Sequence, residues 1–226
     1  HFIIGAAVPY STFTPIIEKD YPELAQMIER IGSRQVRNNG TLGGNVGNAS
    51  PIGDMPPALI ALGAELTLQC GVKTRTVVIE DYFTGYKQTV LAQSEFIKDI
   101  SIPKAVPEKV LKLYKISKRI DDDISAVLAA IYIEVDNNIV KSCRIAFGGM
   151  AAIPMRAKHC EMALVSKTFN AENIKVAQQA LTLDFSPMSD VRASDKYRMI
   201  VAQNLLQKCY LELQNKNIET RVVHYA

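Results

Sequence analysis

The chain has 226 residues, enough for one large domain or two small ones, and its 48% apolar residues are sufficient for extensive hydrophobic cores. The net charge is only +3, with Lys and Arg interspersed among nearly as many acids, so a nucleic-acid-binding surface is not expected. Four widely spaced cysteines and three histidines argue against a metal site, an iron–sulfur cluster or a disulfide framework in this chain, and favour the reducing cytoplasm. No apolar run approaches the roughly 20 residues of a membrane span.

The first half of the chain predicts a mixed α/β region. Residues 2–7 indicate a buried strand, after which Ser11 or Thr12 can cap a short helix. Pro22 is suited to the first position of a second helix, whose apolar residues share one face. Beyond a glycine-rich stretch we expect a further helix that starts at two prolines and ends at Gly63. Alternating or β-branched segments then predict strands at 64–69, 74–79 and 94–102.

The second half predicts an antiparallel sheet covered by helices. Residues 104–109 are the best candidate linker, and strands are expected at 110–116, 124–135 and 139–147. A short Asp-Asn-Asn turn between the last two indicates a hairpin. Helices are expected at 156–164, 171–181 and 194–213. The fold class is therefore α+β, with one domain at 1–103 and a second at 104–226.

The glycine-rich stretch is the strongest local signal, because five of the twelve glycines fall between Gly40 and Gly53. It lacks the lysine of a nucleoside triphosphatase loop and the paired glycines of a Rossmann turn. Its unobstructed N–H groups can instead form a concavity for a diphosphate, with Thr41 and Asn45 as further donors. Asp54 could then accept hydrogen bonds from ribose or ribityl hydroxyls. A tight structural crossing where only glycine fits would give the same composition, so composition leaves both interpretations open.

Residues 33–59 as a whole resemble the signature of FAD domains in the molybdenum hydroxylases, and within that family they are most similar to the bacterial xanthine dehydrogenase small subunit. The similarity continues, in the family's order, through residues 82–89, 95–103, 114–125 and 146–151. It implies an FAD-binding α/β domain, here partial, followed by a three-stranded antiparallel sheet packed with helices, like the C-terminal domain of carbon monoxide dehydrogenase flavoprotein.

The resemblance also implies an electron-transfer role. A purine is hydroxylated at a molybdenum centre on a partner chain, electrons pass through 2Fe–2S clusters to FAD, and the flavin gives hydride to NAD⁺ as hypoxanthine or xanthine is oxidised to urate. The implied partners are a molybdopterin-binding large subunit and the N-terminal iron–sulfur domain of the same subunit, in a hetero-oligomer.

The same resemblance assigns cofactor contacts along the chain. Gly40 to Gly44 would hold the diphosphate region of FAD, Asp54 its polyol or ribose, and Lys115 the flavin ring. The full set of implied contacts is Ile31, Gly32, Gly40, Thr41, Leu42, Gly43, Gly44, Asn45, Asp54, Ile97 and Lys115. Asp122, within a run of three acids, would lie over the flavin face where NAD⁺ docks; a solvated loop or helix N-cap is the usual explanation of such a run.

The chain opens at His1 inside its first predicted strand, and the family's first glycine-rich turn and iron–sulfur domain are not in it. We therefore expect the later part of a longer small subunit, which on its own binds FAD weakly or not at all. The alternatives are a flavoprotein medium subunit of a carbon monoxide dehydrogenase or aldehyde oxidase-type hydroxylase and, in another class, a docking domain without a cofactor.

Overall fold

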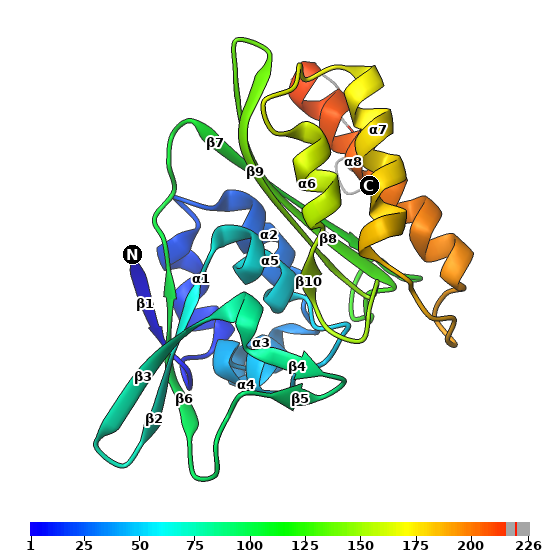
Figure 1. Ribbon diagram of the computed structural model, residues 1–226. Helices are drawn as coiled ribbons and strands as arrows, with labels where there is room; N and C mark the ends of the chain where they lie inside the picture. Colours follow the sequence, from blue (N-terminus) through cyan, green and yellow to red (C-terminus); the bar gives the residue numbers. More distant parts are fainter. Residues whose placement is uncertain (216–219, 221–226) are drawn as a thin grey trace.

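The computed structural model describes residues 1–215 and residue 220; the remainder of the predicted second domain lies outside the described residues. Two four-stranded antiparallel sheets lie at different levels of the molecule, with a group of helices between them and a second group beyond the sheet of the second half (Figure 1). Within the described residues, no helix combines the length and apolar character needed to cross a membrane.

The first sheet contains both ends of the first half of the chain. Its strand order is β1–β6–β2–β3, so the first strand pairs with a strand nearly 100 residues later. Leu66 and Leu68 of the alternating strand are fully buried, which confirms the predicted strand with one face in the core. The bounds are β1 (Phe2–Gly5), β2 (Glu65–Cys70), β3 (Lys73–Val78) and β6 (Phe96–Ile102). A 3₁₀ helix, η1 (Ile79–Asp81), precedes a small hairpin of β4 (Phe83–Gly85) and β5 (Gln88–Thr89).

The helices of the first half are α1 (Tyr10–Ile17), α2 (Pro22–Glu29), α3 (Arg34–Asn39), α4 (Leu42–Gly47), which lies within the glycine-rich stretch, and α5 (Met55–Leu62). Pro22 starts α2 and Gly63 ends α5, as predicted. The predicted cap of α1 is wrong, because Pro9 is the N-cap and Ser11 and Thr12 lie inside the first turn. Pro9 already has the extended φ and ψ of an N-cap residue, so α1 begins there without a side-chain hydrogen bond from a hydroxyl.

The second sheet has the order β10–β9–β8–β7, with bounds β7 (Lys109–Ile116), β8 (Val127–Asp136), β9 (Ile139–Gly148) and β10 (Met155–Arg156). The expected hairpin is confirmed, and both Asn137 and Asn138 take the positive φ of its tight turn. The expectation of three strands is wrong by one short strand: Met155 and Arg156 pair with β9. The predicted helix consequently starts at Lys158 and not at Arg156.

Both faces of the second sheet are buried. In β8, Val127, Ala129 and Ile131 belong to a core shared with the last helices. The residues between them, Leu128 and Ala130, belong to the core of the first half. Helices α2 and α5 contact one face, and α6 (Lys158–Leu164), α7 (Ala171–Asp184) and α8 (Asp195–Gln214) cover the other (Figure 1). A sheet buried on both faces explains the continuous apolar run of β8.

Two polar contacts also join the halves. Arg144 of β9 donates to the carbonyls of Ile60 and Ala61 at the end of α5 and pairs with Glu80 at 2.7 Å. The N–H of Gly149 donates to the carbonyl of Pro51 at 2.8 Å. The turn after β9 is thereby held against the first half of the chain.

The turn at Gly149 generates a stability prediction. Gly149 has φ +79°, and a Cβ atom there would press on the carbonyl oxygen of Ala126, whereas Gly71 has φ +57° with open space around it. Gly149→Ala should therefore lower the free energy of unfolding by about 2–4 kcal/mol, from backbone strain plus crowding. Gly71→Ala, the matched control, should cost only about 1 kcal/mol, from strain alone. Urea unfolding measures both; equal losses would show that Gly149 is not crowded.

A polar cluster fixes α8 on β7. Glu212 accepts hydrogen bonds from the hydroxyls of Tyr114, at 3.0 Å, and Thr220, and pairs with Lys112 at 3.0 Å and Lys208 at 3.1 Å. Burial by itself would raise the pKa of Glu212, but these hydrogen bonds and charges outweigh it and lower the pKa to about 2.

This lowered pKa predicts an acid-sensitive contact. Because the pKa of an unfolded glutamate is about 4.3, Glu212 contributes its stabilisation above that pH and loses it as the pH falls towards 2. The contribution should be on the order of 2 kcal/mol. Glu212→Gln should lower the unfolding free energy at pH 7 and flatten its decline below about pH 5. Denaturant unfolding across that range measures it; parallel curves for variant and wild type would contradict it.

Candidate functional site

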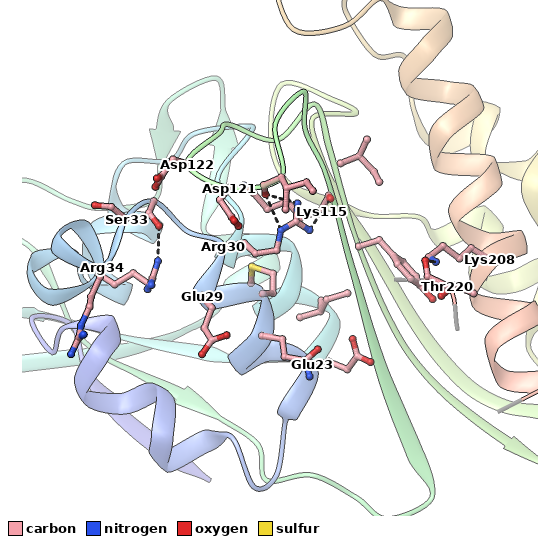
Figure 2. A pocket seen from close by; sticks show the side chains of 18 residues that line it. Glu23, Glu29, Arg30, Ser33, Arg34, Lys115, Asp121, Asp122, Lys208 and Thr220 are labelled. Atoms are coloured by element: carbon pink, nitrogen blue, oxygen red, sulfur yellow. Dashed lines mark hydrogen bonds between the residues drawn. The ribbon is translucent and has the colours of Figure 1, made fainter. Parts of the chain in front are cut away.

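A cavity with a volume of about 900 Å³ lies between the α2–α3 segment and β7. Its walls are formed by the end of α2, by Gly32 and Ser33, by residues 113–116 of β7 and by the loop that follows. Figure 2 shows Arg30, Ser33 and Arg34 on the helical side, and Lys208 and Thr220 beyond the strand. This size is in the range of pockets that bind cofactors.

The cavity carries charges of both signs. Its cationic residues are Arg30, Arg34, Arg37, Lys115 and Lys208. Its acidic residues are Glu23, Glu29, Asp121 and Asp122. Several groups are already engaged: Arg37 donates to the carbonyl of Gly32 at 2.5 Å, and Lys208 pairs with Glu212. A ligand with anionic and hydroxyl groups would find complementary partners in such a mixture.

A buried ionic cluster adjoins the cavity. The Nζ of Lys115 donates to Asp54 Oδ2 at 2.5 Å and to Ser125 Oγ at 3.0 Å, and Ser125 donates to Asp54 Oδ1 at 2.5 Å. Lys115, Asp54 and Ser125 are 5%, 8% and 2% exposed, respectively. Lys115 also lines the cavity, so its ammonium is a fixed cation at the cavity wall. An ammonium has three donors, and two of them are accounted for by these contacts.

The three members of the cluster come from separate segments. Lys115 lies in β7, Ser125 ends the loop before β8, and Asp54 is the residue before α5. The side chain of Asp54 does not cap that helix, so both of its oxygens are free to face the second sheet. The N–H of Ala126 donates to the carbonyl of Ile116, which closes the β7–β8 loop and brings Ser125 towards Lys115.

The three consecutive acids have separate roles. Asp123 is structural: it accepts from the N–H groups of Arg119 at 2.9 Å and Ile124 at 2.8 Å, and these bonds hold its pKa below the usual range. Asp121 and Asp122 are exposed and line the cavity. Asp122 has φ +52°, a conformation that Asp tolerates better than most residues.

Arg30 attaches this loop to α2. Its guanidinium donates to the carbonyl of Ile120 at 2.9 and 3.1 Å and to the carbonyl of Lys115 at 3.1 Å (Figure 2). The loop that carries Asp121 and Asp122 is therefore held by an arginine from the opposite wall of the cavity.

The glycine-rich stretch differs from the expected open turn. It forms the short helix α4, capped by Thr41, whose Oγ accepts from the N–H of Gly44 at 3.0 Å. The N–H of Gly40 donates to Val36, and that of Gly43 donates to the carbonyl of Ala6. The expectation of unengaged N–H groups is thus wrong for Gly40, Gly43 and Gly44, because each of these N–H groups donates to an acceptor within the chain.

Packing explains two of the predicted positions in this stretch. A Cβ at Gly43 would clash with the backbone of Ala6, whose carbonyl oxygen would be 2.7 Å away, so the tight-crossing interpretation applies there. The Leu42 side chain is fully buried in the first core, which leaves only its main chain for a cofactor contact.

Two polar atoms near the stretch are buried without a hydrogen-bond partner among the described residues: Asn45 Oδ1 and the hydroxyl of Tyr10. Tyr10 is 3% exposed, and its ring lies against Gly40. Burial raises the pKa of Tyr10, and the negative charge of Asp54 raises it further. Buried polar atoms of this kind are expected to meet a partner that is not part of the chain, such as a ligand or water.

The predicted residues therefore fall into two groups. Gly32, Lys115 and Asp122 line the cavity, whereas Gly40 to Asn45 lie outside its lining. Ile97 of β6 lies beside the end of α4, since a Cβ at Gly47 would be 3.6 Å from its Cδ1. Ile31 is partly buried against the first core. Asp54 is related to both groups: it accepts a hydrogen bond from Lys115 at the cavity, and its negative charge raises the pKa of Tyr10 beside Gly40.

Ser125, Tyr10 and Arg30 were not predicted from the sequence. The position of Ser125 could have been inferred, because a polar residue just before the apolar run of a predicted strand must lie near the end of the preceding strand in a hairpin. Tyr10 and Arg30 carry no local signal, since the contacts that place them here, with the carbonyls of Gly40 and Lys115, join residues that are 30 and 85 positions apart.

Comparison with known proteins matches both halves of the chain. The model of the FAD binding domain in molybdopterin dehydrogenase matches residues 1–105, and that of the CO dehydrogenase flavoprotein C-terminal domain matches residues 112–213. The glyceraldehyde dehydrogenase medium chain of Sulfolobus acidocaldarius is 31% identical over 212 residues, which cover 93% of this chain and 75% of that one.

Two further relatives are similar to a comparable part of this chain. The xanthine dehydrogenase of Drosophila subobscura is 28% identical over 238 residues, which cover 97% of this chain but only 18% of that protein. Carbon monoxide dehydrogenase from Hydrogenophaga pseudoflava, in a form without the Mo-pyranopterin moiety, superimposes with a TM-score of 0.86 at 27% identity, over 91% of this chain and 72% of that chain. The expected α+β fold, with its flavoprotein C-terminal-like part, is confirmed. The chain belongs to the FAD-binding flavoproteins of the molybdopterin dehydrogenase family.

Proposed function

We propose that the chain carries FAD as the electron-transfer subunit of a molybdenum hydroxylase. The observation that carries this proposal is the buried cluster of Lys115, Asp54 and Ser125 beside a cavity of about 900 Å³, in a chain of an FAD-binding family. When bound, FAD would take up electrons released by substrate oxidation and pass them on as hydride. The partners would be a molybdopterin-binding large subunit and an iron–sulfur domain.

The side chains present fit a dinucleotide. The buried acceptor Asn45 Oδ1 requires a donor, and the hydroxyl of Thr41, which accepts from Gly44, still has its own hydrogen to donate. Arg34 and Arg37 lie on α3, which leads directly into Gly40, and both line the cavity. The N–H groups of Gly43 and Gly44 are already hydrogen-bonded within the chain, so we assign charge neutralisation of the diphosphate to these arginines. The glycines would instead allow the cofactor to approach the main chain closely.

Lys115 would be the residue that adjusts the flavin electronically. Its ammonium is held in place by Asp54 and Ser125, so it does not need to reorganise when the ring changes charge. A fixed cation beside the ring favours the more electron-rich state of the ring. Asp54 would at the same time offer its remaining lone pairs to hydroxyls of the polyol or ribose, as expected for a carboxylate beside a sugar.

Asp122 would act on the electron acceptor. Its loop lines the cavity, and Arg30 from the opposite wall holds the backbone of that loop at Ile120. We propose that this acid lies beside the flavin face at which NAD⁺ docks, where a negative charge influences the preference for NAD⁺ over dioxygen.

Two substrate classes remain candidates. Xanthine dehydrogenase is favoured by the Arg-Ile-Asp-Asp-Asp-Ile segment that begins at Arg119, and by similarity to the Drosophila protein. An aldehyde or carbon monoxide dehydrogenase is supported at least as well, because the medium chain of Sulfolobus acidocaldarius and the Hydrogenophaga enzyme are matched over about three quarters of their own lengths. The substrate would be selected in the molybdenum subunit.

The proposal is tested on the complete subunit co-purified with its partners. We expect a yellow complex whose flavin absorption is retained on desalting and bleached when the substrate is added without oxygen. Assays with xanthine, an aldehyde and carbon monoxide, each with NAD⁺ or dioxygen, would separate the candidate reactions. A colourless complete subunit that shows no affinity for added FAD would instead support a docking domain without a cofactor.

A charge-removing variant tests the role of Lys115. Lys115→Met in the assembled enzyme should lower the flavin midpoint potential by about 30 mV, equivalent to about 1.4 kcal/mol for two electrons. Lys112→Met, which removes a cation from the same strand but outside the cavity lining, is the control and should leave the potential unchanged. Spectroelectrochemical titration measures both, and an equal potential in all three proteins would remove Lys115 from the flavin environment.

A further inference from the structure

Arg198 of α8 is a charged side chain buried in the second half of the chain. It is 2% exposed, and its Nη1 donates to the carbonyls of Ala126 and, at 3.0 Å, Gly149. Its Nη2 pairs at 2.7 Å with Asp190, which is itself exposed to solvent. Burying a guanidinium is costly even when it is paired, so an apolar side chain would fill this space at less cost. The two carbonyls that Arg198 binds therefore indicate what it is used for.

The first carbonyl lies next to the buried cluster of Lys115, Asp54 and Ser125. Ala126 follows Ser125 directly in the chain, and its N–H donates at 2.8 Å to the carbonyl of Ile116, the residue after Lys115. Ala126 is thus held by β7 through its N–H and by α8 through its carbonyl. The neighbouring Ser125 transmits this support, because its hydroxyl bonds to both Lys115 and Asp54.

The second carbonyl leads to the segment that carries Asp54. The N–H of Gly149 donates at 2.8 Å to the carbonyl of Pro51, three residues before Asp54, while the carbonyl of Gly149 accepts from Arg198. A Cβ at the preceding Gly148 would lie 3.5 Å from the same Pro51 oxygen, so the turn packs directly on this segment. Arg198 therefore supports the backbone on both sides of the cluster.

The guanidinium and its two carbonyls are closely packed. A Cβ at Gly149 would lie 2.8 Å from Nη1 of Arg198 and would also press on the carbonyl oxygen of Ala126, so there is no room for a methyl group among them. The donors of a guanidinium lie in one rigid plane. The spacing between the turn after β9 and the loop before β8 is therefore determined by Arg198.

We propose that Arg198 is a positioning residue for the flavin: by holding the backbone beside Ser125 and Asp54, it orients the ammonium of Lys115 at the cavity wall. The inference rests on the proposed function, in which Lys115 faces the flavin ring, and it extends the site to a residue outside the cavity lining. A cation that is to remain fixed while the ring changes charge requires support for the groups that hold it.

The test measures the flavin midpoint potential of the assembled enzyme. Arg198→Met should lower the potential in the same direction as Lys115→Met but by less, because Lys115 loses its orientation and keeps its charge. In the Lys115→Met background the same substitution should cause no further shift, since Arg198 acts through Lys115. Arg198→Lys retains the charge and a donor for the carbonyls, and it should recover most of the wild-type potential.

Arg156→Met is the matched control. Arg156 is also a partly buried arginine of the second half, but it pairs with Glu161 of α6 and with Glu80, and it lies outside the cavity lining. Its loss should lower the melting temperature of the enzyme, because the charge of Glu161 is left without this partner. The flavin potential should stay at the wild-type value.

Amide hydrogen exchange in the complete flavin-free subunit tests the support itself. In Arg198→Met the N–H groups of Ala126 and Gly149 should exchange about three- to tenfold faster, as for the loss of one hydrogen bond, and more so than amides at the centre of β8. Because this measurement needs no flavin, it separates the inference from the proposed function.

Three results would overturn the inference. A lower melting temperature with a wild-type potential in Arg198→Met would leave Arg198 a purely structural role. A shift that persists in full in the Lys115→Met background would mean that the charge of Arg198 acts on the flavin directly. If Arg198→Met does not assemble, Arg198→Gln, which keeps one donor group for the two carbonyls, takes its place, and an unchanged potential in it overturns the inference.

Failure of the proposed function has a different signature. A wild-type subunit that binds no FAD removes that function, and the exchange measurement then decides on Arg198 alone: unchanged exchange at Ala126 and Gly149 overturns the support that Arg198 is proposed to give.

Discussion

The bond between Lys115 and Asp54 is the interaction on which the site depends. Both side chains are nearly excluded from solvent, and a charge in that position is tolerated only with a well-placed partner. Removing one partner from a buried pair typically costs about 3–5 kcal/mol, because the other charge is left uncompensated. One member precedes α5 and the other lies in β7, so the candidate site is complete only when both halves of the chain have docked.

The docking itself is apolar. The second sheet presents Leu111, Leu113 and Leu128 to the core of the first half, and Val127, Ala129 and Ile131 to the last helices. Arg144 and Glu80 add a polar contact at the border, where the Arg144 guanidinium donates to carbonyls in the last turn of α5. Hydrophobic area thus supplies the stability of the arrangement, and the ionic pairs determine its register and the position of the site.

Turns and helix ends that depend on neighbouring residues could be predicted from the sequence, whereas contacts between distant segments could not. Pro22, Gly63 and the Asn137–Asn138 turn act on their own neighbours, so the elements they delimit were predicted correctly. The start of α1 and the helical turn at Leu42 were missed, because Pro9 and the Thr41 cap compete with stronger-looking signals nearby. Of the candidate-site residues, Asp54 was proposed from its position after the glycine-rich stretch, whereas the roles of Lys115 and Asp122 came from family resemblance. Ser125, Arg30 and Tyr10 act across 10 or more residues, and composition and spacing do not reveal such contacts.

The alternating burial of β8 has a consequence for the evolution of these flavoproteins. A strand whose odd and even side chains serve two different cores cannot be replaced without refitting both. Recombination between relatives at the boundary near residue 104 would therefore join mismatched surfaces unless α2 and α5 were inherited together with the sheet. The two segments that separate family models match therefore share one packing interface, through α2, α5 and the second sheet.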